Sequence, residues 1–440
     1  MVVSPLEDRY RTEMNAVFDE ENRLRRWMDV EIALAKAHAA LGNIPSDAPA
    51  KIEAAAKKVR LARVKQIENE IHHDLMAMVK ALAEQCPKSY GGYVHIGATS
   101  YDIEDTATAL IFQDALTLTD ARLIELMHIT RRLAAANKER VCIGRTHGQH
   151  AVPTTYGLKF AIYYRELRRH KHRLEQLMPR ILVGKMSGAV GTMATFGKDA
   201  FYVEWFVMSE LGLRPAAVTN QVLQRDRHAE AMFLLALIAS TLEKIAKEVR
   251  NLQRTEIMEL AEPFAQKQVG SSTMPQKRNP HKSERICSLA RIVRGNVATA
   301  LENIPLEHER DLTNSASERF IFAESFITTD YMMKETAKVL NGLEFFPDNI
   351  ECNLEFTNGR IMAERVMIAL TKKGIGRQDA HELVREASII SFKAGKPLEK
   401  VLAEDRKVTR LLKPAELKVL FDPHTYIGEA KKIVERSIEE

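Results

Sequence analysis

Apolar residues in the middle of the chain, spaced three and four positions apart, constrain the fold more than any other feature of the sequence. One such run extends through residues 235–252. This spacing places all of its side chains on one face of an α-helix, as in helices that pack against each other at a shallow angle. The run consists of Leu235, Ile238, Leu242, Ile245, Val249 and Leu252.

Two further segments have the same pattern, one within residues 104–137 and one after Pro280. Between about residues 104 and 340 the alternation typical of strands is nearly absent. The pattern therefore predicts an all-α fold with a central bundle of long helices. The apolar positions are Phe112, Leu116, Leu123, Leu126 and Leu133 in the first segment, and Ile286, Leu289, Val293 and Val297 in the second.

Turn-forming residues flank this block of helices. Gly91, Gly92 and Gly97 precede it, and a Phe-Pro-Asp-Asn sequence at 346–349 follows it. We therefore predict three helical domains, at residues 1–100, 101–347 and 348–440. Three glycine-containing stretches interrupt the central block and are predicted to be loops that carry polar side chains on a rigid scaffold. They lie at residues 144–157, 184–197 and 270–280.

Composition narrows the class of protein. The 64 basic and 59 acidic side chains leave a formal charge of only +5, which gives little support for a nucleic-acid partner. The N-terminus carries charges and lacks an apolar core, and no run of eighteen uncharged apolar residues occurs, so we expect neither a signal peptide nor a membrane partner. The four cysteines form no CxxC pair, which fits a reducing cytoplasm.

The stretch at 270–280 is the most informative part of the sequence. A glycine and two serines are followed by Lys277 and Asn279, which together could bind and polarise a carboxylate. The alternative is an ordinary polar loop between helices. The whole string resembles the signature loop of the fumarase/aspartase superfamily, and this resemblance implies that Ser271 is the general base. Backbone N–H groups and Lys277 would lower the cost of forming its alkoxide.

A second stretch holds two histidines, His147 and His150, three positions apart. Packing or surface histidines, metal ligands and an acid/base group are all open alternatives. We predict no metal site, because the sequence lacks HExxH or a comparable motif. The stretch resembles the Thr-His-Gly motif of the adenylosuccinate lyases, a family of this superfamily. The resemblance implies that His147 is the general acid and that Glu284 orients it; alternatively, Glu284 is an ordinary glutamate in the first turn of a helix.

Two motifs nearer the N-terminus also resemble this family. His72, His73 and Asp74 resemble its Arg-His-Asp triplet, which implies that His73 binds substrate and could transfer a proton; the departure from arginine leaves the role of His72 open. The motif that begins at His95 and includes Thr99 and Ser100 resembles the first superfamily motif, whose Thr-Ser pair binds a carboxylate. A helix N-cap is the alternative for this pair.

A phosphate separates the substrates of this family from those of fumarase and aspartase. Arginines and hydroxyls scattered along the chain resemble the nucleotide-binding positions of the family, and they suit a substrate that carries a phosphate and two carboxylates. Taken singly, each arginine could equally be a solvated surface residue. The set is Arg9, Tyr10, Gln221, Arg310, Ser315 and Arg319.

The resemblance implies β-elimination of fumarate from a nucleotide-linked succinate without a cofactor, since the substrate carboxylate itself takes up the electrons. It further implies a homotetramer with a twenty-helix core and active sites shared between subunits. Three alternatives remain: another superfamily member such as an argininosuccinate lyase, a relative without turnover, and a helical nucleic-acid binder. The last is suggested by a basic run at residues 165–173, which is more often a solvated face.

Overall fold

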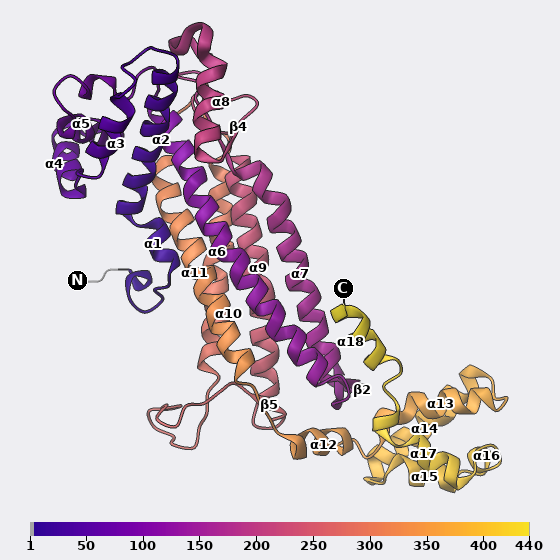
Figure 1. Ribbon diagram of the computed structural model, residues 1–440. Coiled ribbons are helices and arrows are strands. Elements are labelled where there is room, and N and C mark those ends of the chain that lie inside the picture. The colour runs from indigo at the N-terminus through magenta and orange to yellow at the C-terminus, as the bar shows by residue number, and fades with distance from the viewer. Residues whose placement is uncertain (1–3, 440) are drawn as a thin grey trace. The chain divides into compact units, whose positions relative to one another are not determined.

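The computed structural model describes residues 4–439 and confirms the all-α prediction. Among these residues there are eighteen α-helices and six short strands (Figure 1). Residue contacts divide the chain into two compact units. The first contains residues 1–124, 169–242 and 288–334, and the second contains residues 125–168, 243–287 and 335–440. The predicted division into three domains stays a prediction.

Long helices form at the positions that the apolar spacing predicts, and each contributes residues to both units. Within the first unit three of them meet at Phe112 of α6, whose ring lies 5.1 Å from that of Phe322 on α11 and 5.6 Å from that of His228 on α9. The five long helices are α6 (Ser100–Ala136), α7 (Tyr156–Ile181), α9 (Asp226–Leu252), α10 (His281–Glu302) and α11 (Ser315–Asn341).

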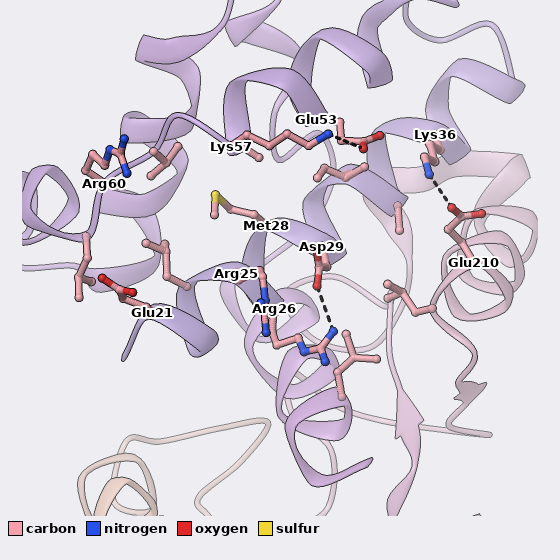
Figure 2. A pocket seen from close by; sticks show the side chains of 18 of the residues that line it. Glu21, Arg25, Arg26, Met28, Asp29, Lys36, Glu53, Lys57, Arg60 and Glu210 are labelled. Carbon is pink, nitrogen blue, oxygen red and sulfur yellow. Dashed lines mark hydrogen bonds and ion pairs between the residues drawn. The ribbon is translucent and has the colours of Figure 1, made fainter. Parts of the chain in front are cut away.

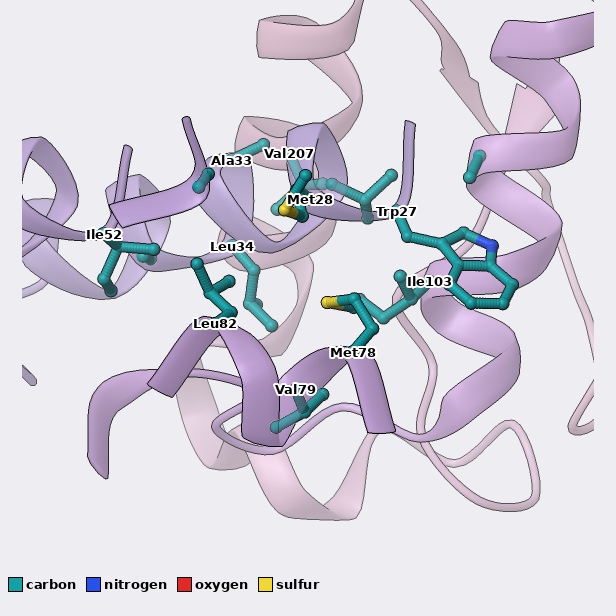
Figure 3. Packing of buried hydrophobic residues seen from close by; sticks show 14 of the residues in the cluster. Trp27, Met28, Ala33, Leu34, Ile52, Met78, Val79, Leu82, Ile103 and Val207 are labelled. Carbon is teal, nitrogen blue, oxygen red and sulfur yellow. The ribbon is translucent and has the colours of Figure 1, made fainter. Parts of the chain in front are cut away.

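The first unit also contains a layer of shorter helices around one apolar core. Figure 3 shows Trp27 and Leu34 of α2 packed with Met78 and Leu82 of α5 and Ile103 of α6. Asp19 begins α2 as an N-cap that accepts a hydrogen bond from the Asn22 N–H. The shorter helices are α1 (Met14–Phe18), α2 (Glu20–Ala40), α3 (Ala48–Ala56), α4 (Leu61–Ile71), α5 (Asp74–Gln85) and α8 (Ala200–Leu211).

The second unit ends in a group of short helices with a core of its own. Val366, Leu370, Val384, Leu402 and Val408 are among the buried residues of this core. The helices are α12 (Pro347–Glu355), α13 (Ala363–Lys372), α14 (Arg377–Ala394), α15 (Leu398–Glu404), α16 (Arg406–Thr409), α17 (Pro414–Leu420) and α18 (Ala430–Glu439).

Short strands, which the sequence did not predict, make three two-stranded sheets. β1 and β2 form an antiparallel hairpin, β3 pairs with β4 in parallel, and β5 pairs with β6 antiparallel. The stretch at 144–157 therefore belongs mainly to a hairpin. The strands are β1 (Val141–Thr146), β2 (Gln149–Thr155), β3 (Val183–Gly184), β4 (Arg214–Pro215), β5 (Leu260–Ala261) and β6 (Glu344–Phe345).

Candidate active site

His147 lies at the tip of the β1–β2 hairpin. Thr146 pairs with Gln149, so the turn consists of His147 and Gly148 alone. Both have positive φ angles, 53° and 74°, as the tight turns that suit the twist of a hairpin require. The His147 side chain is consequently exposed at the end of the β1–β2 hairpin.

A buried carboxylate fixes this hairpin to the rest of the second unit. Glu259 is completely buried and accepts hydrogen bonds from Arg145 of β1, from the Tyr156 hydroxyl at 2.5 Å and from Asn353 of α12 at 3.0 Å. Hydrogen bonds to a buried charge are strong, so the base of the hairpin is held firmly. Sequence analysis missed Glu259, which lies more than a hundred residues from Arg145.

His150, the other histidine of the stretch, differs from His147 in its surroundings. It lies on β2, where burial lowers the pKa of the imidazole and the nearby Arg145 guanidinium lowers it further, against a smaller opposing effect of Glu259. Its ring packs 5.8 Å from the Phe356 ring. A neutral, packed imidazole fits the structural alternative for His150 and leaves His147 as the candidate acid.

The signature loop, residues 270–280, folds back on itself. A Cβ atom on Gly270 would lie 2.0 Å from the Lys277 carbonyl oxygen, so only glycine permits this approach. The Asn279 side-chain amide closes the loop by donating to the Gly270 carbonyl at 2.8 Å. The Ser271 hydroxyl oxygen accepts from the backbone N–H groups of Thr273 and Met274, at 3.3 and 3.1 Å. Donors of this kind stabilise an alkoxide.

Two buried side chains that the sequence did not reveal hold the base of the signature loop. The Gln253 amide donates to the Arg278 carbonyl at 3.1 Å, and its oxygen accepts from the Glu262 N–H at 3.0 Å. The Glu262 carboxylate in turn accepts from the N–H groups of Lys282 and Ser283, at the N-terminus of α10. This cap fixes the helix turn that presents Glu284, whose side chain is exposed.

A cavity of about 820 Å³ lies beside the signature loop in the second unit. It is lined by Lys277, Asn279 and Glu284. Basic side chains of α9 and of the segment that follows α9 also line it, including Arg250 and Arg254. Basic groups outnumber the acidic ones, so the cavity suits an anionic ligand. Three of the residues predicted for the signature chemistry thus share one cavity.

His147 is not joined to the other predicted catalytic groups of its unit. Over residues 4–439 the hydrogen bonds and ion pairs link it to none of Ser271, Lys277 and Glu284. The predicted orientation of His147 by Glu284 therefore stays a prediction.

In the first unit, residues predicted to bind the nucleotide gather around the first turn of α6. The Arg310 guanidinium lies over the Tyr101 ring, 3.8 Å from its centre, and donates to the Gln221 side-chain oxygen at 2.8 Å. Ser315 and Arg319, at the start of α11, line a small cavity with Tyr101. Sequence analysis missed Tyr101, although it lies within the first superfamily motif. We call this cavity, with Arg310 at its edge, the arginine cluster.

The histidine triplet lies where α4 meets α5. His72 ends α4 in a left-handed conformation with φ of 56°, and the His73 imidazole caps α5 by accepting from the Met76 N–H at 3.4 Å. Asp74 accepts from Arg319 at 2.6 Å. Burial raises the pKa of Asp74, but the hydrogen bonds from Arg319 and from the Leu75 N–H, together with the charges of Arg319 and Arg23, outweigh burial and the pKa is lowered. The triplet is therefore tied to the arginine cluster through Asp74.

His95 is held by a buried glutamate that the sequence did not reveal. Its Nδ1 atom lies 2.6 Å from Oε1 of Glu31, and Oε2 of the same carboxylate accepts from the His95 backbone N–H at 3.0 Å. Burial lowers the pKa of His95, yet the hydrogen bond and charge of Glu31 exceed that effect and raise it overall. His95 is thus favoured in its charged form, which suits contact with an anion.

Ser100 is the first residue of α6, and Thr99 directly precedes it. The Thr99 N–H donates to the Asp102 carboxylate at 2.8 Å. Asp102 is fully buried, pairs with the fully buried Lys185, and accepts from the Ser187 N–H at 2.9 Å. This ion pair holds the stretch at 184–197 against the helix N-terminus. A carboxylate-binding role for Thr99 and Ser100 is compatible with the cap and stays a prediction.

Arg9 and Tyr10 lie just before α1. Arg9 is exposed, and the Tyr10 ring packs edge-on against Tyr331 of α11 with 5.0 Å between ring centres. These two residues are therefore fixed to the first unit, which also contains the arginine cluster.

The first unit contains another cavity, larger than the one in the arginine cluster, and none of the residues predicted for the active site line it. It has a volume of about 670 Å³ and lies among α2, α3 and α8 (Figure 2). Most of its charged groups pair with each other: Arg26 with Asp29, Lys57 with Glu53, and Lys36 with Glu210. Because the charged side chains that line this cavity largely neutralise each other, the cavity has little net charge to attract an ionic substrate.

Two residues of the basic run at 165–173 make clear contacts within the chain. Lys171 pairs with Asp120 and Glu175, and His170 is buried with Nε2 2.9 Å from the Thr241 hydroxyl. Arg169, His172 and Arg173 are exposed, so these contacts do not decide the nucleic-acid alternative. Over the described part of the chain, no helix is long and apolar enough to cross a membrane. The same residues contain no group of three or more His, Cys, Asp or Glu that could hold a metal ion.

Comparison with known proteins places the chain in a family. A family model described as "Lyase" matches residues 7–295, and one described as "Adenylosuccinate lyase C-terminus" matches residues 359–437. Adenylosuccinate lyase from Pyrococcus abyssi is 55% identical, and the alignment covers 100% of this chain and 98% of that protein. The same enzyme from Aquifex aeolicus is 40% identical over 98% of each.

Solved structures of lyase-superfamily proteins have the same fold as this chain. A fumarate lyase from Mesorhizobium sp. BNC1 has a TM-score of 0.90 at 32% identity, covering 97% of both chains. The 3-carboxy-cis,cis-muconate lactonizing enzyme from Pseudomonas putida has a TM-score of 0.91 at 32% identity, covering 99% of this chain and 98% of that one. With full-length similarity to adenylosuccinate lyases and a lyase fold throughout, the chain belongs to the adenylosuccinate lyase family of the fumarate lyase superfamily.

Proposed function

We propose that the chain cleaves adenylosuccinate to AMP and fumarate, and the succinyl-aminoimidazole-carboxamide ribotide to AICAR and fumarate, in purine biosynthesis. The observation that carries this proposal is the presence of two cation-rich sites in one chain. The cavity beside the signature loop suits a succinyl carboxylate, and the arginine cluster suits a phosphate. Full-length identity to adenylosuccinate lyases supports it further.

The proposed reaction is a β-elimination. Ser271, as an alkoxide stabilised by the loop N–H groups, removes a proton from the carbon next to a succinyl carboxylate. The carboxylate takes up the electron pair, and Lys277 and Asn279 stabilise the added negative charge. The C–N bond then breaks, and His147 donates a proton to the departing nitrogen. No metal or cofactor takes part in this scheme, because the substrate carboxylate is the electron sink.

The remaining predicted residues bind and orient the substrate in this proposal. His73 contacts the substrate and could transfer a proton, whereas Asp74 acts on the nucleotide end through Arg319. Thr99, Ser100 and His95 serve the second carboxylate. Arg9, Tyr10, Gln221, Arg310, Ser315 and Arg319 serve the nucleotide and its phosphate.

We propose a homotetramer in which each active site draws residues from several copies. Four copies of the five long helices would give the twenty-helix core. Those helices expose large apolar side chains, among them Ile162, Phe233, Ile292 and Phe320, which a second copy could cover. Among the described residues no hydrogen bond or ion pair joins His147 to Ser271 or Glu284, which supports shared sites. The four cysteines are free thiols, which supports a cytoplasmic location.

A substrate panel tests the proposed activity. The purified chain is incubated with adenylosuccinate, the succinyl-aminoimidazole-carboxamide ribotide or argininosuccinate, with and without EDTA, and fumarate release is followed. We expect fumarate from the two nucleotides, none from argininosuccinate, and equal rates with EDTA, because the arginine cluster requires a phosphate and the scheme uses no metal. Turnover of argininosuccinate alone would assign the chain to the alternative lyase, and loss of activity in EDTA with recovery on zinc would refute the metal-free scheme.

A further inference from the structure

Arg310 differs from the other arginines of the arginine cluster in the groups that hold it. Arg225 is buried and donates to two carboxylates at 2.9 Å each, and Arg319 donates to the Asp74 carboxylate at 2.6 Å. Arg23 pairs with a glutamate of its own helix at 3.3 Å. In contrast, Arg310 makes no ion pair with any of residues 4–439. No carboxylate of the described chain therefore contacts its guanidinium.

Two uncharged groups hold Arg310 instead. Its Cζ atom lies 3.8 Å from the centre of the Tyr101 ring. This is well within the distance of about 6 Å over which an aromatic face attracts a cation. The Gln221 side-chain oxygen accepts from Nη1 of Arg310 at 2.8 Å, and the Gln221 amide is itself fixed because it donates to the Ala189 carbonyl at 2.9 Å. The guanidinium is thus held on one face and at one nitrogen.

The Tyr101 ring is a fixed surface for this contact. It is only 4% exposed and belongs to the first turn of α6, where the buried pair of Asp102 and Lys185 anchors the helix. Burial raises the pKa of the Tyr101 hydroxyl to about 12, so the side chain brings no charge to the arginine cluster. A buried ring on a long helix has little freedom to move, and it restricts the side chain that lies on it.

The other edge of the Arg310 guanidinium is unused. Its Nε atom is buried without a hydrogen-bond partner among residues 4–439, and Nη2 makes no hydrogen bond with them either. Nε and Nη2 together form an edge that can bind two oxygens of one phosphate side by side. Buried donors without a partner are rare in folded proteins. This edge therefore points to an oxygen ligand that comes from outside the described chain.

The aromatic contact solves a problem that an ion pair would not. A carboxylate partner would also fix Arg310, but it would offset the positive charge and compete with a ligand for the donors of the guanidinium. A ring face uses none of the N–H groups and leaves the charge in place. Arg310 is consequently positioned without being neutralised.

We propose that Tyr101 is a positioning residue for the phosphate of the nucleotide: its ring holds Arg310 so that the unused Nε and Nη2 donors face that phosphate. The inference rests on the proposed function, because it assigns Arg310 to the nucleotide phosphate. Since the arginine is ordered before the ligand arrives, less freedom is lost on binding.

Tyr101→Leu should weaken binding of AMP. Leucine keeps an apolar side chain under Arg310 but removes the aromatic face, so the Kd for AMP should rise roughly fivefold to thirtyfold, the range for a desolvated cation–aromatic contact. The phosphate does not react, so KM for adenylosuccinate should rise while kcat stays within about twofold of wild type. Calorimetric titration and steady-state kinetics of the full chain measure these effects.

Two comparisons separate positioning of Arg310 from a general structural role. Adenosine lacks the phosphate, so its Kd should be the same for Tyr101→Leu and wild type. Tyr101→Phe keeps the ring and loses only the hydroxyl, so its Kd for AMP should stay within a few-fold of wild type. Phe392→Leu is the control, because it removes an exposed ring of the second unit that lies 5.3 Å from Arg360, and it should change neither Kd.

A double-variant cycle tests whether Tyr101 acts through Arg310. Arg310→Gln alone should weaken AMP binding. Adding Tyr101→Leu to Arg310→Gln should cause no further loss, because the ring then has no guanidinium to hold. If Tyr101→Leu does not fold, Tyr101→Met replaces it in every comparison, since methionine adapts to irregular space but has no aromatic face.

Four results would overturn the inference. They are a wild-type Kd for AMP in Tyr101→Leu, an equal loss of affinity for adenosine, a Tyr101→Phe protein as impaired as Tyr101→Leu, and an undiminished effect of Tyr101→Leu in the Arg310→Gln background. A wild-type protein that binds no AMP would instead refute the proposed function, and this inference with it. The two failures are distinguishable, because only the second appears before any variant is made.

Discussion

Ser271→Ala should lower kcat by at least about 10²–10⁴-fold, the usual contribution of a general base, while the Kd for AMP stays within a few-fold of wild type. The hydroxyl is needed only to remove the proton, and the arginine cluster that would hold the phosphate lies in other segments of the chain. Steady-state kinetics and AMP titration measure the two effects separately.

Ser272→Ala is the matched control for this prediction, because it deletes the neighbouring hydroxyl of the same turn. The Ser272 hydroxyl makes only a 3.4 Å contact with the Thr273 hydroxyl, so the loss of kcat should be far smaller than for Ser271→Ala. Near-normal turnover of Ser271→Ala would remove Ser271 from the role of base and shift attention to His73.

Lys185→Met should have the largest effect on stability, lowering the free energy of unfolding by about 3–5 kcal/mol. Lys185 and Asp102 are both completely buried, so removal of the ammonium leaves a carboxylate without its counter-charge inside the first unit. The measurement is denaturant unfolding at a fixed protein concentration, because assembly would also contribute to stability.

A surface ion pair of the same unit supplies the control for Lys185. Lys36 and Glu210 are more than a third exposed, so Lys36→Met should cost less than about 1 kcal/mol. Combining Lys185→Met with Asp102→Asn should cost less than the sum of the two single changes, since the double variant buries no unpaired charge. Equal effects of Lys185→Met and Lys36→Met would show that the buried pair contributes no more than a surface one.

The helices could be predicted from the sequence because their periodicity is local. Residues 235–252 all fall within α9, and the pattern around Phe112 falls within α6. The β1–β2 hairpin was not predicted. Val141, Cys142 and Ile143 are all buried, so β1 lacks the alternation that marks a strand, and Pro153 lies within β2.

The candidate site could be predicted only in part, and for a physical reason. Residues in motifs can be found by resemblance, because their spacing along the chain is short. The buried carboxylates Glu31, Glu259 and Glu262 act through contacts with His95, Arg145 and Ser283 that lie far from them in sequence or depend on tertiary packing. No local pattern distinguishes such residues from surface glutamates.

Mixing two inactive variants tests whether residues held by different copies of the chain act on one substrate. His147→Ala and Ser271→Ala proteins should each be nearly inactive. After unfolding and refolding together in equal amounts, random mixing should restore activity in about a quarter of the sites of a closed oligomer. Activity near that fraction of wild type is the predicted result. No recovery from tetramers shown to be mixed would contradict the claim, because both residues would then serve the same site from one chain.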